Sequence, residues 1–158
     1  MRVPFYCNEK SAIYVYMTFG KVDDTKFLLR LEPGDEINTT IQTFCKEQQI
    51  ANASISGIGS VENPTLAHYR LDTKKFSEKQ LTGIFEVTSL LGTVALVEKE
   101  PLVHLHITVS DENMHVYAGH LMKGAVSATL EVVLTVLPSA FEKKFSEEIG
   151  LKLYEFSE

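Results

Sequence analysis

Short apolar runs rich in β-branched and aromatic residues recur along the chain, and this pattern constrains the fold more than any other feature. Glycine, proline, asparagine and aspartate separate the runs at the spacing typical of antiparallel strands. The predicted strands are residues 13–19, 26–31, 53–58, 66–71, 83–90, 94–97, 102–109, 115–118 and 128–137. Long βαβ units are missing, which disfavours a parallel nucleotide-binding sheet. We therefore expect an α+β fold with a mainly antiparallel sheet.

Two helices are expected to flank this sheet. The first follows the Pro-Gly turn at residues 33–34, where the Asp35 carboxylate can accept the first free N–H groups. Its apolar positions, at helical spacing, are Ile37, Ile41, Phe44 and Cys45. The second is expected at residues 140–148 and ends at Gly150, before a last strand at residues 151–154. Its apolar positions are Phe141, Phe145 and Ile149.

The length and composition are those of a single globular unit. With 158 residues and 44% hydrophobic side chains, the chain can bury one core, so we expect one domain over residues 1–158. The first residues lack the apolar stretch of a signal peptide, and no run of 18 apolar residues occurs. We therefore expect a cytoplasmic protein without a membrane partner. Cys7 and Cys45 are expected to be free thiols.

The formal charge of −6 disfavours DNA as a partner, because affinity for a duplex comes largely from neutralising its phosphates. The basic residues at 74–75 with Lys79 form only a small group, and Lys143 with Lys144 is interpreted as part of a solvated helix face. The motif Gly57-Ile58-Gly59 lacks the third glycine and the helix of a phosphate-binding loop. It predicts a tight bend or close backbone packing.

Three histidines indicate a metal site. In the strand at residues 102–109 the side chains alternate, so His104 and His106 share one face while the aliphatic residues share the other. Residues 110–113 are typical of a hairpin turn, which would carry His120 back beside this strand. A lone histidine is more often a surface or hydrogen-bonded side chain, but three converging imidazoles suit zinc in an open tetrahedral site. Nickel, cobalt, iron and copper also accept such ligands.

Two carboxylates interrupt apolar runs and are candidates for a catalytic role. Glu86 and Glu131 could each orient a ligating histidine, act as a general base, or form a structural pair with Arg30. In an enzyme, Arg30 could hold an anionic substrate. His115 is expected to be solvated at the turn, and His68 has no evident partner in the sequence.

The succession of motifs resembles the prokaryotic branch of the plants and prokaryotes conserved (PPC) family, from about Ser11 to Tyr154. Ala118 replaces a glycine that is usual before Gly-His, and Thr93 replaces a common asparagine. The segments that carry the resemblance, in order, are residues 30–37, 54–61, 83–92, 101–106, 119–121 and 129–132.

The resemblance implies a seven-stranded, mainly antiparallel sheet with flanking helices and assembly as a homotrimer. Members of this family are described as candidate DNA-binding proteins, and in plants the domain accompanies an Arg-Gly-Arg-Pro hook that is absent here. The fold is also similar to that of acetolactate decarboxylase, a zinc lyase. Two functions stay open: a zinc-binding trimer with an assembly or regulatory role, or a zinc-dependent enzyme acting on a small carbonyl or carboxylate substrate.

Overall fold

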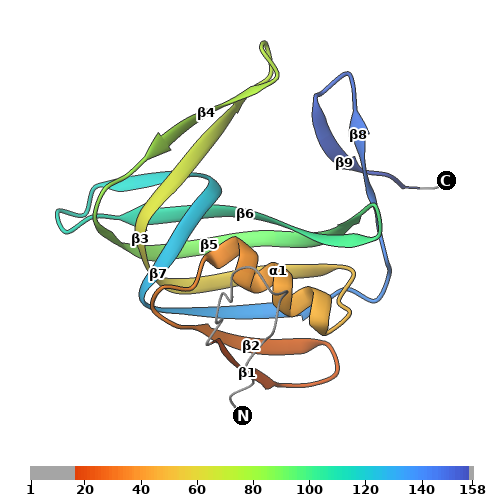
Figure 1. The fold of residues 1–158 in the computed structure, drawn as a ribbon, viewed down its shortest axis with the longest axis horizontal. Helices are drawn as coiled ribbons and strands as arrows, with labels where there is room; N and C mark the ends of the chain where they lie inside the picture. The colour runs from red at the N-terminus through yellow and green to blue at the C-terminus, as the bar shows by residue number, and fades with distance from the viewer. Residues whose placement is uncertain (1–16, 157–158) are drawn as a thin grey trace, which may run out of the picture.

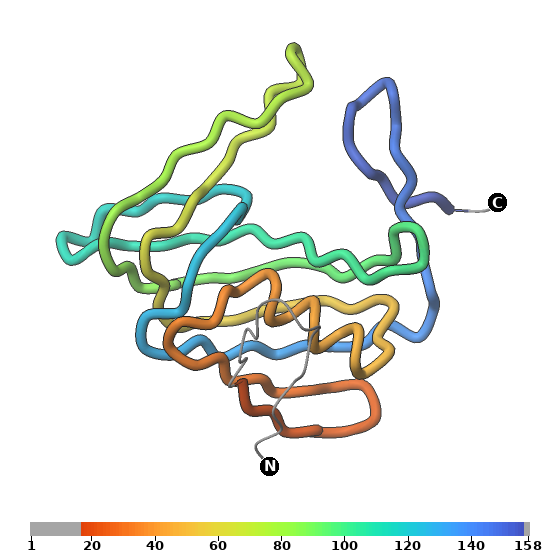
Figure 2. The backbone as a smooth tube through the Cα atoms, in the orientation of Figure 1, coloured from red at the N-terminus to blue at the C-terminus, as the bar shows by residue number. Residues whose placement is uncertain are grey.

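The computed structural model describes residues 17–156 and consists mainly of β-strands (Figures 1 and 2). The first seven strands are β1 (Thr18–Lys21), β2 (Lys26–Leu31), β3 (Ala53–Arg70), β4 (Lys75–Gln80), β5 (Ile84–Val97), β6 (Glu100–Ser110) and β7 (Val116–Val136). They form one sheet in the order β1-β2-β7-β6-β5-β3-β4, and all its pairs are antiparallel. β8 (Lys143–Ser146) and β9 (Leu151–Tyr154) form a separate hairpin. The predicted α+β class and seven-stranded antiparallel sheet are confirmed.

Three strands are longer than predicted because each joins two predicted runs. β3 joins 53–58 to 66–71, β5 joins 83–90 to 94–97, and β7 joins 115–118 to 128–137. The ladders contain register shifts, for example between Gly57 and Gly59, so the strands bend where the sequence suggested an end. Because β3 also pairs with β7, strands β3, β5, β6 and β7 close a ring.

The two outer strands of the sheet, β1 and β4, were predicted less well from the sequence than the inner strands. β4 has no counterpart among the predicted strands, because its side chains are mostly polar and all exposed. It is held by pairing with the outer half of β3, and the two extend away from the sheet as a hairpin (Figure 1). β1 overlaps the run predicted at residues 13–19 only at its end, since residues 13–16 lie outside the described part of the chain.

Helix α1 (Ile37–Glu47) covers one face of the sheet (Figure 1). Its predicted apolar positions, Ile37, Ile41, Phe44 and Cys45, are all buried in the core. The capping residue is Glu36 and not Asp35: the Glu36 carboxylate accepts the Thr39 N–H at 2.8 Å. The Asp35 carboxylate instead accepts the Glu32 N–H at 2.9 Å and closes the preceding turn. The prediction of Asp35 as the cap was therefore wrong by one residue.

The predicted second helix is absent from the described residues, and β8 occupies its place. Buried Asn52 holds this segment extended: its side chain accepts the Phe141 N–H at 2.6 Å and donates to the Phe141 carbonyl at 3.1 Å. Residues four apart also share a face of a strand, so the spacing of Phe141 and Phe145 fits both structures. Lys143 and Lys144 therefore lie on a strand and not on a helix face. The predicted last strand is confirmed as β9.

Gly57 and Gly59 lie where β3 passes close to β7, as the sequence predicted. A Cβ atom on Gly57 would stand 2.7 Å from the Glu131 carbonyl oxygen, and one on Gly59 would stand 2.7 Å from the Leu130 Cα. Distances this short leave no room for a side chain. Close backbone packing, and not phosphate binding, explains this motif.

Cys45 is a buried free thiol, and burial raises its pKa to about 12. The expectation for Cys7 lies outside the described residues. Within residues 17–156, no helix has the length and apolar character needed to cross a membrane.

Candidate metal centre

Strand β6 presents two histidines on the sheet face opposite α1. Leu105, Ile107 and Val109 are at most 2% exposed and pack in the core. The alternation of a strand therefore turns His104 and His106 to the other face, where His104 is half-buried and His106 is exposed. This is the arrangement that the sequence predicts.

The third histidine comes from the neighbouring strand. A tight turn follows β6, in which the Asp111 carboxylate accepts the N–H groups of Asn113 and His115 at 2.9 Å each. β7 then returns antiparallel to β6, with His120 directly opposite His106. The predicted hairpin and its direction are confirmed.

The three imidazole rings face one another. Their centroids are 5.2 Å apart for His104 and His106, 5.0 Å for His104 and His120, and 5.5 Å for His106 and His120. One ring nitrogen from each histidine lies within 4.8 Å of the others. Tetrahedral zinc sites hold such nitrogens about 2.1 Å from the ion, so small side-chain rotations suffice to bring all three onto one ion.

Burial keeps two of these imidazoles neutral. Partial desolvation lowers the pKa of His104 to about 4, and the positive charges of Lys143, His120 and His106 add to this effect. The pKa of His120 is lowered by desolvation first and by His106 second. Because a metal ion binds the unprotonated imidazole, these rings are in the ligating form at neutral pH. The three histidines thus form a group that can hold a metal ion.

A pocket of about 920 Å³ opens over the three rings. One wall is the β3–β4 hairpin, from which the Phe76 ring packs at 5.3 Å against His120. The opposite wall is the β8–β9 hairpin, which contributes Lys143, Phe145 and Tyr154. Both hairpins extend from the same side of the sheet (Figure 1). The histidines therefore lie at the base of a cleft large enough for a small organic molecule.

The other candidate residues lie away from this pocket. Arg30 and Glu131 are opposite each other on β2 and β7, and the Arg30 guanidinium contacts the Glu32 carboxylate at 2.6 Å. Glu86 is exposed on β5 and lies opposite Ser110, which is four residues along β6 from His106. None of Arg30, Glu86 and Glu131 is among the residues that line the pocket. One alternative for these glutamates was a structural pair with Arg30, but the ion pair of Arg30 is with Glu32.

Sequence reasoning missed the residues that complete the pocket. Lys143 and Tyr154 come from the C-terminal hairpin, and His68, which had no evident partner, lines the pocket from β3. Only the predicted strand at residues 151–154 pointed toward this wall. His115 is exposed as expected, and its ring contacts the Asp111 carboxylate at 3.1 Å.

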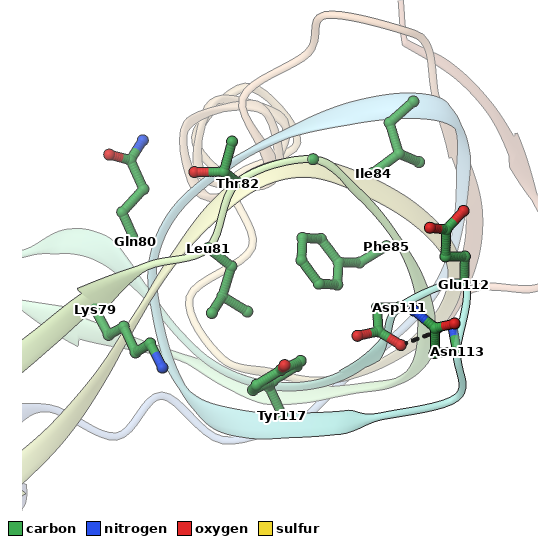
Figure 3. Close-up of a pocket in the computed structure, with 11 residues that line it drawn as sticks. Lys79, Gln80, Leu81, Thr82, Ile84, Phe85, Asp111, Glu112, Asn113 and Tyr117 are labelled. Carbon is green, nitrogen blue, oxygen red and sulfur yellow. Dashed lines mark hydrogen bonds between the residues drawn. The ribbon is translucent and has the colours of Figure 1, made fainter.

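A second pocket, of about 770 Å³, lies at the end of the ring of strands (Figure 3). Leu81, Phe85 and Tyr117 point into it, and Asp111 lies at its rim (Figure 3). The Asp111 carboxylate already accepts two backbone N–H groups in the turn, which lower its pKa. This pocket has no converging metal ligands among the described residues.

Comparison with known proteins assigns this chain to a protein family. The sequence profile of the Plants and Prokaryotes Conserved domain, abbreviated PCC or PPC, matches residues 19–138. This chain is a member of the PPC family. The match spans the seven-stranded sheet and the three histidines, while β8 and β9 lie beyond it.

Solved structures similar to this PPC protein support the same assignment. A plant- and prokaryote-conserved protein from Pyrococcus horikoshii has a TM-score of 0.78 at 32% identity, covering 90% of this chain and 96% of that one. A metal-containing protein from Archaeoglobus fulgidus has a TM-score of 0.77 at 32% identity, covering 90% and 98%. A candidate DNA-binding protein from Bacteroides thetaiotaomicron has a TM-score of 0.85 at 27% identity, covering 89% and 97%.

Two further similarities are more distant or partial. A Staphylococcus aureus protein described as similar to alpha-acetolactate decarboxylase has a TM-score of 0.52 at 12% identity. The similarity covers 70% of this chain and 52% of that one, and at this level of identity it shows a related fold and nothing more. The curated relatives are bifunctional GlmU proteins of Synechococcus strains, 30% identical over 122 residues. The match covers 76% of this PPC chain and 18% of the length of those relatives.

Proposed function

We propose that this PPC protein is a zinc-binding homotrimer with an assembly or regulatory role. The observation that carries the proposal is the convergence of His104, His106 and His120 at the base of one pocket. Three neutral imidazoles match the ligand set of zinc sites that keep a fourth position for water or another ligand. The similar Archaeoglobus fulgidus protein is described as metal-containing, which supports a metal in this chain as well.

Metal analysis of the purified full-length protein tests the proposal. Prepared without chelator, the protein should carry about one equivalent of a divalent metal per chain, and zinc should predominate over nickel, cobalt, iron and copper. Less than about a tenth of an equivalent of any transition metal would refute it. One equivalent of a metal other than zinc would support the proposed site but show that zinc is not the ion it holds.

The homotrimer is supported by an apolar row on the open face of the sheet. Leu28, Val133 and Leu91 are 49%, 42% and 57% exposed. Leu28 is opposite Val133, and Ser56 lies between Val133 and Leu91 in register, so one row crosses four strands. Exposed apolar side chains gathered on one sheet face are typical of an interface between chains. Light scattering should therefore give three times 17.7 kDa, or about 53 kDa.

A zinc-dependent enzyme is the second candidate, favoured by the roomy pocket beside the histidines. The described residues that line this pocket include no Asp or Glu, so the expected general bases Glu86 and Glu131 are not in place. Among the described groups, proton transfer would fall to His68, Tyr69 or Lys143. A carboxylate-based lyase mechanism is therefore less well supported than metal and ligand binding.

Direct DNA binding is the weakest proposal, although similar proteins are described as candidate DNA-binding proteins. The formal charge of −6 opposes the phosphate contacts on which duplex affinity depends. In a gel shift at physiological salt we expect no complex. A complex whose affinity falls steeply with added salt would show that DNA binding had been wrongly set aside.

A further inference from the structure

Positive charge gathers in the pocket over the histidines, although the chain as a whole is acidic. Lys143 and Lys152 line the pocket, and none of the described lining residues is Asp or Glu. A divalent ion held by three neutral imidazoles keeps both of its positive charges, because its ligands bring no negative charge. A site of this composition favours an anion as its remaining ligand.

Lys143 is placed to meet such an anion. Its ammonium group lies 4.6 Å from the centre of the Tyr154 ring and forms no ion pair within residues 17–156. Partial burial lowers the pKa of Lys143, because desolvation disfavours the charged ammonium group. Its neighbour Lys144 differs: the Lys144 ammonium pairs with the Glu155 carboxylate and is absent from the pocket lining.

The two walls of the pocket are fixed to each other. The Tyr69 hydroxyl of β3 donates to the Ile149 carbonyl at 2.6 Å, and the Lys74 ammonium donates to the Glu147 carbonyl at 2.6 Å. These bonds join the β3–β4 hairpin to the turn between β8 and β9. At the base of the β8–β9 hairpin, Asn52 holds Phe141. The cleft is therefore formed before a ligand arrives, which reduces the entropic cost of binding.

Most of the remaining lining of the pocket is apolar, and the pocket is larger than a carboxylate group needs. Phe76 contributes from one wall, Phe145 and Leu153 from the other, and Val103 from β6. A volume of about 920 Å³ is in the range of pockets that hold small organic ligands. The ligand should therefore combine one anionic head with an apolar body.

From this arrangement, which rests on the proposed metal site, we infer that the pocket binds a small organic monocarboxylate. The carboxylate lies between the ion held by the histidines and the Lys143 ammonium, and the apolar tail lies against Phe76, Phe145 and Leu153. Lys143 takes the anion-holding role that the enzyme hypothesis gave to Arg30.

Calorimetric titration of the zinc-loaded, full-length protein tests this with hexanoate as the probe and hexanamide as its neutral counterpart. Hexanoate should bind and hexanamide should not. Lys143→Gln should weaken hexanoate binding by about tenfold, because it removes a charge-assisted contact, while Lys143→Arg should retain it. Lys144→Gln is the matched control and should bind like the unmodified protein. Zinc content, measured on each variant, shows that the site has formed.

The outcomes separate the inference from the proposed function. If the protein holds no metal, both fail. If it holds zinc but binds neither compound, or binds hexanoate and hexanamide equally, the inference alone fails. It also fails if Lys143→Gln and Lys144→Gln bind hexanoate with equal affinity while both retain zinc.

Discussion

His106 on β6 and His120 on β7 occupy opposite positions in one antiparallel pair, and their ring centroids lie 5.5 Å apart. Because both backbones are held by the same ladder, the spacing of the two rings is set by the sheet and not by a flexible loop. His104, two residues along β6, adds the third ring from the same face. The backbone positions of all three proposed ligands are therefore fixed by neighbouring strands of the sheet.

Removal of one ring should abolish tight metal binding. We expect His120→Ala to lower the metal content from about one equivalent per chain to less than a tenth, since two imidazoles hold zinc far more weakly than three. Elemental analysis after dialysis measures this. His115→Ala is the control, because His115 is exposed in the turn and is not one of the three proposed ligands. Retention of full metal content by His120→Ala would remove His120 from the ligand set.

The depressed pKa of His104 predicts a pH dependence of stability in the metal-free protein. The unfolded chain takes up a proton at this histidine near pH 6.5, whereas the folded chain does so only at about 4. Stability should therefore fall as the pH drops from about 6.5 to about 4, and this contribution should level off below that window. Urea unfolding of the unmodified protein and of His104→Asn measures the difference. An equal fall in both proteins would contradict the prediction.

Gly92 on β5 should tolerate no side chain. A Cβ atom there would meet the His104 carbonyl and stand 2.6 Å from a methyl group of Leu105, the residue opposite Gly92 on β6. We expect Gly92→Ala to lower the free energy of unfolding by about 2 kcal/mol or more and to weaken metal binding. Gly20→Ala on β1 is the control, since nothing lies within 4 Å of its Cβ position, and it should change stability by about 0.5 kcal/mol or less. Denaturant unfolding of the two variants decides.

A charge in the apolar row should disrupt the proposed trimer. Leu91→Glu places a carboxylate among side chains that the assembly would bury, and an unpaired buried charge is costly. Light scattering should then show a shift from about 53 kDa toward the 17.7 kDa monomer. Val22→Glu is the control, because Val22 is 66% exposed in the turn after β1 and outside the row. A trimer that survives Leu91→Glu would place the interface elsewhere.

The sequence alone determined the sheet class and the grouping of the three histidines. Both depend on local rules: side chains alternate along a strand, and a four-residue turn returns the chain beside it. These rules need no knowledge of distant residues. They place His104 and His106 on one face and bring His120 opposite His106, as the pairing of β6 with β7 confirms.

Only the tertiary structure decided what surrounds the histidines. The contact of Asn52 with Phe141 joins residues 89 positions apart, and it converts a segment with helix-compatible spacing into the strand that carries Lys143. Strand pairing between distant segments also decides where Glu86, Glu131 and Arg30 lie, and none of them lines the pocket. Local periodicity contains no information about such contacts, because they depend on which surfaces the folded sheet brings together.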